Sequence, residues 1–412
     1  MLTRRIFLRG SAMVMAGAGA VPVWLRRAAA ATPGKRKVLI AIFQRGAADG
    51  LNVVVPFADK TYYDLRPTIS IGPPSGLPVP GALNSPFGTA IDLDGHFGLN
   101  PVLQPLKALW DRKMLAIVEA TGSPDPTRSH FDAQDYMESG TPGSKRDGWL
   151  NRALPPAGAE SSPLRAVAIS SNLPRTLQGD HSAIAVNDVQ KFRAGEDTAI
   201  VESMYAASRD RQMASAGRDA FGAVRMIESL NKTNYSPAGG AQYGLAGELG
   251  RRLQQIARLI KADAGVEAAF AEIGGWDHHQ NEANQLNNVL RQFGTALSAF
   301  TADMGDRMED IVLVTMSEFG RAAQENGDNG TDHGHGSLMF VLGGPVQGGK
   351  VYGKWPGLEK EHLYEGRDLA VTTDFRAVLS ELIAGQYGTR DLSQVFPGYR
   401  MESPLGLLAA GV

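Results

Sequence analysis

The chain has 412 residues, of which 43% are hydrophobic and 20% charged, and its formal net charge is -2. This composition is typical of a globular protein with a sizeable core, and the near-neutral charge gives no reason to expect nucleic acid or an anionic membrane surface as a partner. Cysteine is absent, which excludes disulfides, thiolate metal sites and a cysteine nucleophile.

Residues 1–31 have the features of an export signal. Thr3-Arg4-Arg5-Ile6-Phe7-Leu8-Arg9 is a twin-arginine pattern of the kind that the bacterial Tat machinery reads, and a Gly/Ala-rich apolar segment follows at residues 10–25. Ala28-Ala29-Ala30-Ala31 offers small-residue cleavage sites. Because the apolar segment is shorter than the roughly 20 residues that a spanning helix needs, we expect cleavage and release into the periplasm or the medium, with no membrane span left. Retention as an anchor is the alternative.

The remaining residues, 32–412, alternate between two kinds of periodic segment and are predicted to form a single α/β domain. Continuous apolar runs of strand length occur at residues 37–43, 114–119, 164–169, 266–273, 311–316 and 338–342. Helical spacing of apolar residues occurs at residues 101–110, 129–139, 245–262, 286–308 and 374–383. Strands that alternate with helices predict a mostly parallel central sheet with helices on both faces. A helical insertion is predicted around residues 197–265.

Three loops rich in metal-ligand residues each follow a predicted strand. The first contains Asp49, the second contains Asp277, and the third is Thr331-Asp332-His333-Gly334-His335-Gly336. Ligands bind beyond the carboxyl ends of the strands in such sheets, and Asp and His are donors suited to zinc and other divalent metals. We therefore expect these loops to build one metal site. For the third loop taken alone, the alternative is a glycine turn with a helix-capping Asp.

Several motifs together resemble those of one known family. They are residues 43–52, residues 129–136, Gly274-Gly275-Trp276-Asp277, Ser317-Glu318-Phe319-Gly320-Arg321 and residues 331–336. With them the chain resembles the bacterial DUF1501 family of domains of unknown function, which is grouped with the alkaline phosphatase and sulfatase superfamily. The resemblance covers nearly all of the mature chain. It implies an alkaline-phosphatase-like three-layer sandwich with a two-metal site at one end.

The resemblance also implies which residues bind the metal ions. Superfamily members supply an Asp after the first strand, an Asp with a His a few residues on, and an Asp-His-Gly motif. The matching residues here are Asp49, Asp277 with His278 or His279, and Asp332 with His333. The ions implied are divalent: zinc, or else calcium, magnesium or manganese.

The chain departs from the superfamily pattern near its C-terminus. Many members provide one more His there, but the setting of His362, Glu361-His362-Leu363, does not match the usual motif. One metal position is therefore weaker, differently built or lost. His130, His96 and His181 are candidate substitutes, although a hydrogen-bonding role at the surface or in the core is the more common one for a single histidine.

The resemblance further places the nucleophile at a helix start that precedes a Ser-Gly or Thr-Gly pair, here Ser139-Gly140. Ser129 is the candidate nucleophile, with Thr127 as the second choice and a metal-bound water as the alternative attacking group. A helix N-terminus beside a cation favours both an alkoxide and an anionic ester. The alternative for Ser129 is an ordinary N-cap.

Other polar residues near these motifs are candidates for supporting roles. His130 or His335 could protonate a leaving group. Glu318 follows a predicted strand and is a candidate ligand or partner of a ligand. Bidentate contacts to an anionic group are the role considered for Arg45, Arg128 and Arg321, against a solvated side chain or a salt bridge.

These features predict an exported, metal-dependent hydrolase of a phosphate or sulfate ester, acting on a small molecule or a polysaccharide. The alternative is a non-catalytic exported member of the superfamily that binds a polyanionic or polysaccharide ligand. A phosphosugar mutase-like activity is a third hypothesis. Export argues against it, because soluble phosphosugars are mainly cytoplasmic.

Overall fold

The computed structural model describes residues 36–75, 85, 87–144, 146–158, 161–192 and 198–409. The predicted export signal at residues 1–31 lies outside these ranges. Within them, no helix combines the length and the apolar character that crossing a membrane requires.

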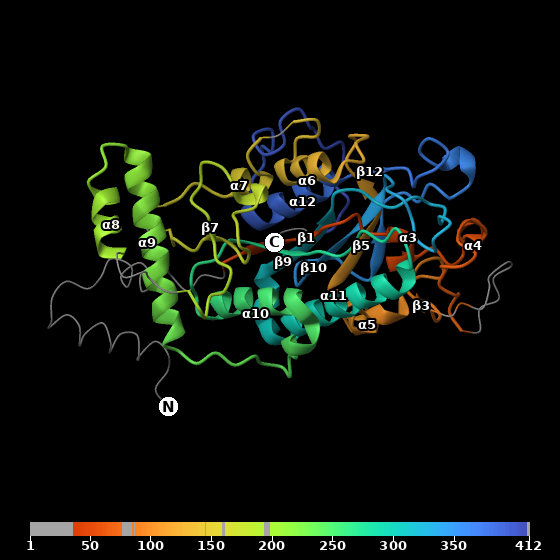
Figure 1. The fold of residues 1–412 in the computed structure, drawn as a ribbon, viewed down its shortest axis with the longest axis horizontal. Coiled ribbons are helices and arrows are strands. Elements are labelled where there is room, and N and C mark those ends of the chain that lie inside the picture. Colours follow the sequence, from red (N-terminus) through yellow and green to blue (C-terminus); the bar gives the residue numbers. More distant parts are fainter. Residues whose placement is uncertain are drawn as a thin grey trace.

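A large mixed sheet runs through the centre of the described chain (Figure 1). Its strands lie in the order β11 (Lys350–Tyr352), β5 (Leu115–Gly122), β10 (Ser337–Gly343), β9 (Ile311–Ser317), β1 (Val38–Gln44), β8 (Ala268–Ile273), β6 (Ala166–Ala168) and β7 (Ile184–Ala185), and β12 (Thr373–Asp374) also pairs with β5. Among these strands, β10 is antiparallel to both of its neighbours. The other pairings are parallel, so the predicted mostly parallel sheet is confirmed.

The central strands are buried on both faces, which explains their continuous apolar sequences. All residues of β1 are buried. Its side chains alternate between two separate cores, with Ile40 and Ile42 in one and Leu39 and Phe43 in the other. A strand that fills two cores has no solvated face, and a polar residue on either side would therefore be costly.

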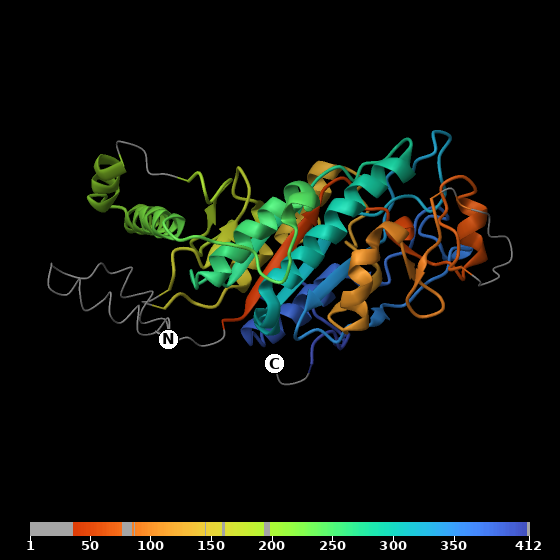
Figure 2. The ribbon, with the colours of Figure 1, turned by 90° about the horizontal axis from the view of Figure 1, so that it is seen from below.

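Helices cover the sheet on both sides (Figures 1 and 2). One layer contains α5 (Gln104–Asp111), α10 (Gly247–Lys261) and α11 (Glu282–Met304). The opposite layer contains α6 (His130–Ser139), α7 (Trp149–Ala153) and α12 (Phe375–Tyr387). Leu253 and Leu290 join the core that contains Ile40, whereas Leu150 and Leu382 join the core that contains Phe43. The predicted three-layer α/β sandwich is confirmed.

Smaller elements surround the sandwich. A second sheet pairs β2 (Val54–Val55) with β4 (Gly98–Leu99) and β4 with β3 (Ile91–Asp92), close in sequence to α3 (Gly50–Val53) and α4 (Lys60–Leu65). Short 3₁₀ helices span Pro101–Leu103, Arg175–Leu177, Tyr243–Ala246, Gly305–Asp310 and Lys360–His362. The helical region predicted around 197–265 contains α8 (Thr198–Ala206), α9 (Arg211–Asn231) and α10. Helix α8 lies away from the sandwich (Figures 1 and 2), whereas Ala223, Met226 and Ile227 of α9 join the core that contains Ile40.

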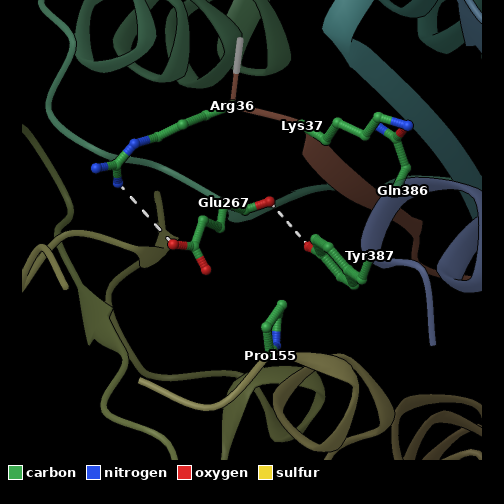
Figure 3. A pocket seen from close by; sticks show the side chains of 6 residues that line it. All are labelled: Arg36, Lys37, Pro155, Glu267, Gln386 and Tyr387. Atoms are coloured by element: carbon green, nitrogen blue, oxygen red, sulfur yellow. Dashed lines mark hydrogen bonds and ion pairs between the residues drawn. The ribbon is translucent and has the colours of Figure 1, made fainter. Parts of the chain in front are cut away.

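The sheet has two ends of different character. At one end Gln44 of β1 lies in register with Ile273 of β8 and Ser317 of β9, so the loops that follow these strands start at one edge. At the opposite end, where β1 begins, a small pocket of about 260 Å³ is lined by Arg36, Lys37, Pro155, Glu267, Gln386 and Tyr387 (Figure 3). The ligand-rich loops of the sequence all belong to the first end, as predicted.

Candidate metal centre

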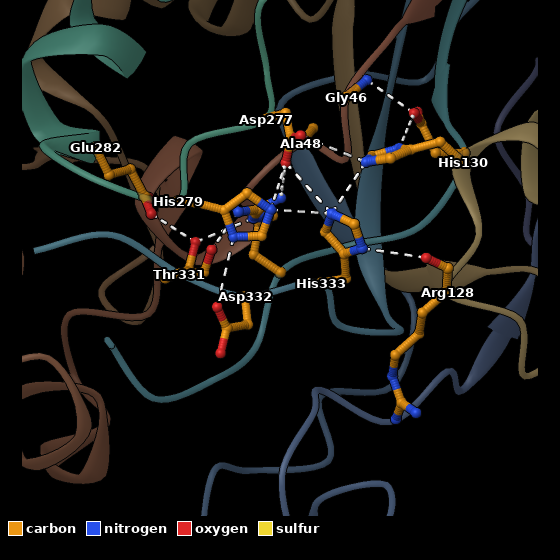
Figure 4. A network of polar contacts seen from close by, with 12 residues as sticks. Gly46, Ala48, Arg128, His130, Asp277, His279, Glu282, Thr331, Asp332 and His333 are labelled. Carbon is orange, nitrogen blue, oxygen red and sulfur yellow. Dashed lines mark hydrogen bonds and ion pairs between the residues drawn. The ribbon is translucent and has the colours of Figure 1, made fainter. Parts of the chain in front are cut away.

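Three imidazoles and one carboxylate converge at the carboxyl end of the sheet (Figure 4). His130 is the first residue of α6, Asp277 and His279 follow β8, and His333 lies between β9 and β10. The Nε2 atom of His333 is 3.0 Å from that of His130 and 3.1 Å from that of His279. The Asp277 carboxylate lies 3.0 Å from His279 Nε2, 3.4 Å from His333 Nε2 and 3.6 Å from His130 Nε2. We call these four residues the metal cluster.

The outer nitrogen of each imidazole in the metal cluster faces a hydrogen-bond acceptor. His130 Nδ1 is 2.9 Å from a Glu318 oxygen, and His279 Nδ1 is 3.4 Å from an Asp332 oxygen. His333 Nδ1 is 3.1 Å from the backbone oxygen of Arg128, which can only accept. When Nδ1 carries the proton in this way, the lone pair is left on Nε2, the atom that points inward.

This geometry fits a bound metal ion. Three inward lone pairs and a carboxylate repel one another unless a cation lies between them. Two nitrogens bound to one tetrahedral zinc at about 2.0 Å each are separated by roughly 3.3 Å, close to the 3.0 and 3.1 Å observed between the Nε2 atoms. Outer partners on each histidine are also the usual support of metal-binding imidazoles. His130, Asp277 and His333 in particular lie close enough to share one ion.

Neighbouring hydrogen-bond donors keep two carboxylates ionised, that of Asp277 in the metal cluster and that of Glu318 behind it. Burial alone would raise the pKa of Glu318, but hydrogen bonds from His130, Gln134 and the Gly46 N–H outweigh it and lower the pKa. Burial likewise opposes ionisation of Asp277, and a hydrogen bond from Arg321 at 2.6 Å lowers its pKa. Both acids are therefore anionic at neutral pH, as a ligand and the partner of a ligand should be.

The pKa values of His130 and His333 are shifted in opposite directions. The hydrogen bond to Glu318 raises the pKa of His130. Burial, and then the nearby His130, lower the pKa of His333. Two imidazoles whose Nε2 atoms are 3.0 Å apart cannot both hold a proton there. The pair can hold one proton or one metal ion between them, but not two protons.

The loop that carries His333 is fixed by backbone pairing with residues 319–322. Ala322 N donates to Asp332 O at 2.8 Å, Gly334 N donates to Gly320 O at 2.8 Å, and Gly320 N donates to His335 O at 2.9 Å. A Cβ at Gly320 would lie 1.8 Å from the Gly336 oxygen, and one at Gly334 would lie 2.3 Å from the Arg321 backbone. These glycines are required because the two backbone segments lie in direct contact.

Ser129 occupies the N-cap position of α6, beside His130. Its side chain makes no capping hydrogen bond and is exposed to solvent. The second candidate, Thr127, is engaged through its hydroxyl, which accepts from Ser129 N at 3.2 Å. Of the two candidate nucleophiles, Ser129 is therefore the one whose hydroxyl makes no capping or turn hydrogen bond within the described chain.

Two of the expected metal ligands are placed elsewhere. Asp49 is buried, and its two oxygens accept hydrogen bonds from Arg66 at 2.5 and 2.9 Å. This guanidinium takes the place that an ion would have beside Asp49. His278 is 2% exposed, and among the described residues neither of its ring nitrogens has a hydrogen-bond partner. Of the adjacent His278 and His279, it is His279 that joins the metal cluster.

Other expected site residues have supporting positions. Asp332 is 65% exposed and faces the outer nitrogen of His279, so it is a partner of a ligand in this arrangement. His335 is buried and stacks on Tyr364, with ring centroids 4.3 Å apart. Arg45 is bonded to Glu138 at 2.8 Å and to Glu272 at 2.6 Å. The side chains of His335 and Arg45 are thus committed to contacts within the protein.

The remaining candidates also have defined partners. Arg128 pairs with Glu365 at 2.8 Å and with Asp368 at 2.6 Å. His96 packs against Phe97 and Trp355, and His362 pairs with Glu359. Arg66 stands in no sequence motif, so the sequence alone does not predict its pairing with Asp49. The neutralisation of Asp49 follows from the fold, which brings the end of α4 beside the loop after β1.

The family of the chain follows from a direct comparison. The family model described as "Protein of unknown function (DUF1501)" matches residues 112–396. The chain belongs to this family. A search of curated proteins finds no match to this DUF1501 protein.

Solved structures similar to this DUF1501 protein include members of the alkaline phosphatase superfamily. A superfamily protein from Vibrio parahaemolyticus is 10% identical, with a TM-score of 0.31 over 76% of this chain and 61% of that one. The lipoteichoic acid synthase LtaP from Listeria monocytogenes is 9% identical, with a TM-score of 0.31 over 74% and 65%. A mutant alkaline phosphatase of the Antarctic bacterium TAB5, with bound Mg, is 13% identical, with a TM-score of 0.31 over 74% and 90%.

The DUF1501 chain thus spans less than two thirds of the length of the first two of these proteins. Likenesses with TM-scores near 0.31 carry no argument about its chemistry. The chemistry of the metal cluster rests on its own side chains.

Proposed function

We propose that this DUF1501 protein is an exported, metal-dependent hydrolase of a phosphate or sulfate ester. The observation that carries the proposal is the convergence of His130, His279 and His333 on Asp277 at the carboxyl end of the sheet. When bound there, a divalent ion supplies Lewis-acid stabilisation of the negative charge that develops on an ester oxygen.

Zinc is the ion that the donor set favours. Imidazole nitrogens suit zinc and other late transition metals, whereas magnesium and calcium prefer sites built from oxygens alone. The metal cluster offers three imidazoles and one carboxylate. We therefore propose zinc in preference to magnesium, calcium or manganese, and one ion in preference to two, because Arg66 already neutralises Asp49.

Ser129 is the proposed nucleophile. Its hydroxyl is exposed, makes no capping bond and belongs to the residue next to His130. The N-terminus of the ten-residue helix α6 contributes partial positive charge at this point, which favours both an alkoxide and an anionic ester. The arginines of the site are occupied by carboxylates, so we assign recognition of the anion to the bound ion and this helix end.

Export is the part of the proposal that rests on sequence alone. The twin arginines and the apolar segment at residues 10–25 support it. Replacing Arg4 and Arg5 by Lys in the full chain should retain the protein in the cytoplasm, and unchanged export in a Tat-deficient host would contradict the assignment.

The hydrolase is tested with protein purified without chelator. Its metal content is measured and its crystals are examined by anomalous scattering, and a panel of aryl phosphates, phosphodiesters and aryl sulfates is assayed. We expect one zinc per chain at the metal cluster and turnover of one ester class, lost in Asp277→Ala. Ser129→Ala should bind zinc normally but lose turnover. Bound zinc without turnover across the panel would overturn the hydrolase and leave a metal-binding protein.

A further inference from the structure

A buried hydrogen-bond chain lies behind the metal cluster. It begins at Arg321, whose Nη1 donates to Asp277 Oδ1 at 2.6 Å and whose Nε donates to Thr331 Oγ1 at 3.1 Å. The Arg321 guanidinium also donates to the backbone oxygen of Thr331. One fully buried guanidinium therefore connects the carboxylate of the metal cluster to Thr331.

The chain continues from Thr331 into the interior (Figure 4). Because the Thr331 hydroxyl accepts from Arg321, its own proton is free to be donated, and Glu282 Oε2 receives it at 2.5 Å. Glu282 is the first residue of α11, and the charge of the neighbouring Asp49 acts on its carboxyl group. Asp49 in turn is paired with Arg66. The members of this buried chain are each at most 1% exposed: Arg66, Asp49, Glu282, Thr331 and Arg321.

The charges along this chain alternate. Burial and the neighbouring Asp49 raise the pKa of Glu282 well above its usual range. Burial opposes ionisation of Asp49 too, but Arg66 lowers its pKa. Glu282 is thus a neutral acid that accepts from Thr331. Each buried cation then has one anion, with no charge left unpaired.

We propose that Thr331 and Glu282 are positioning residues of the metal centre, which hold Arg321 in the orientation that fixes the Asp277 carboxylate. This inference rests on the proposed metal site. Without the Thr331 hydroxyl, the Arg321 Nε–H would be buried without a partner, and the guanidinium would turn to find another. The Asp277 oxygen that it holds at 2.6 Å would move with it.

Matched substitutions separate positioning from a general loss of stability. Thr331→Val removes the hydroxyl at constant shape, whereas Thr331→Ser keeps it. Glu282→Leu removes the acceptor of the Thr331 hydroxyl, whereas Glu282→Gln keeps a neutral side chain with an acceptor oxygen for it. Asp303→Asn, in a buried polar cluster formed with Lys261, is the control for destabilisation elsewhere.

The measured quantities are the affinities for Co²⁺ and Zn²⁺ and the visible spectrum of bound Co²⁺. Partners of ligands typically contribute about 10-fold to 100-fold in metal affinity, so we expect about 10-fold weaker binding and an altered Co²⁺ spectrum in Thr331→Val and Glu282→Leu. Thr331→Ser and Glu282→Gln should bind like the wild type, and Asp303→Asn should unfold earlier without weaker binding. If one disruptive variant does not fold, the other carries the test.

Two outcomes would overturn the inference. The first is a folded Thr331→Val or Glu282→Leu protein that binds Co²⁺ with the affinity and spectrum of the wild type. The second is an equal loss of metal affinity in Glu282→Gln and Glu282→Leu. Either result leaves the hydrolase intact. If the wild type binds no metal, the proposed function fails instead, and crystal structures of metal-free wild type and Thr331→Val decide the positioning role. We expect Arg321 and Asp277 to shift in the variant, and unmoved side chains would reject it.

Discussion

Two carboxylates at opposite ends of helix α11 are surrounded in opposite ways. Asp303, in the last turn of α11, accepts from Lys261 Nζ at 2.6 Å, from Ala238 N at 2.7 Å and from Tyr243 Oη at 3.0 Å, and Tyr235 Oη donates to it as well. Asp277, shortly before α11, accepts from Arg321 but faces three imidazole Nε2 atoms.

The difference between these surroundings shows which of the two is built for a ligand. Every group around Asp303 is a donor, so that cluster is complete without any further atom. Each imidazole around Asp277 instead has an acceptor at its outer nitrogen, namely Glu318, Asp332 or a backbone oxygen, which leaves its inner nitrogen available to an ion. A carboxylate that faces lone pairs needs a cation between them, and one that faces donors does not.

The largest expected effect is on metal binding by Asp277→Ala. Loss of the carboxylate removes a ligand outright, so zinc affinity should fall by more than about 100-fold, beyond what the loss of a ligand's partner produces. Competition with a chelating dye measures the affinity. A change below tenfold would mean that the ion, if bound, is held without Asp277.

Asp303→Asn should act on stability alone. Removing the charge weakens the hydrogen bonds to Lys261 and both tyrosines, and the free energy of unfolding should fall by about 2 kcal/mol. Urea denaturation of the metal-free protein measures this value. Zinc affinity should stay at the wild-type level, and a parallel loss of zinc would erase the contrast between the two carboxylates.

Glu318→Gln tests an outer partner of the metal cluster. The Glu318 oxygen accepts from His130 Nδ1 at 2.9 Å and is buried. A neutral amide orients the imidazole less strongly, so we expect about tenfold weaker zinc binding. Asp303→Asn, in the buried polar cluster with Lys261, is the control for a general loss of stability and should bind zinc normally.

Asp332→Asn should have a smaller effect than Glu318→Gln. Asp332 is 65% exposed and lies 3.4 Å from His279 Nδ1, so solvent can replace its contact. We expect zinc affinity to fall by at most about threefold, which is a small effect for a residue that hydrogen-bonds to a metal ligand. A loss as large as that of Asp277→Ala would instead make Asp332 a direct ligand, as the sequence motif suggests.

The smallest effect concerns pH. Burial opposes ionisation of Asp303, but Lys261 and its other donors lower the pKa, so its contribution to stability is complete above the pKa of the unfolded chain and is lost as the pH falls. At a pH of about 3.9 the Asp303 carboxyl is half protonated in the unfolded chain, and the free energy of unfolding has then fallen by at most about 0.4 kcal/mol through this group. Urea denaturation between neutral pH and pH of about 4 should show this extra loss in the wild type relative to Asp303→Asn.

The sequence predicts the scaffold of the site better than its side-chain partners. Apolar runs identify β1, β8 and β9, and their parallel pairing brings the loops of Asp277 and His333 to one edge. Which neighbour in an Asp-His pair faces inward depends on the local backbone, because successive side chains of an extended segment point to opposite sides. Asp332 and His333 divide in this way.

Long-range pairings could not be predicted from one sequence. His130 reaches the metal cluster from α6 and Arg66 reaches Asp49 from the end of α4, and no spacing in the sequence connects either with its partners. The motif that makes Asp49 an expected ligand specifies only a position in the chain. It contains no information on the Arg66 guanidinium, which pairs with the same carboxylate.

The close contact between residues 319–322 and the His333 loop also limits how this protein can diversify. Any side chain at Gly320, Gly334 or Gly336 would overlap neighbouring backbone. These positions therefore cannot accept the substitutions by which loops ordinarily gain new specificities. Variation among relatives that share the geometry would have to arise on the exposed rim, where Phe131 is 85% accessible next to His130. Selection can reshape that rim freely while the interior of the site stays constant.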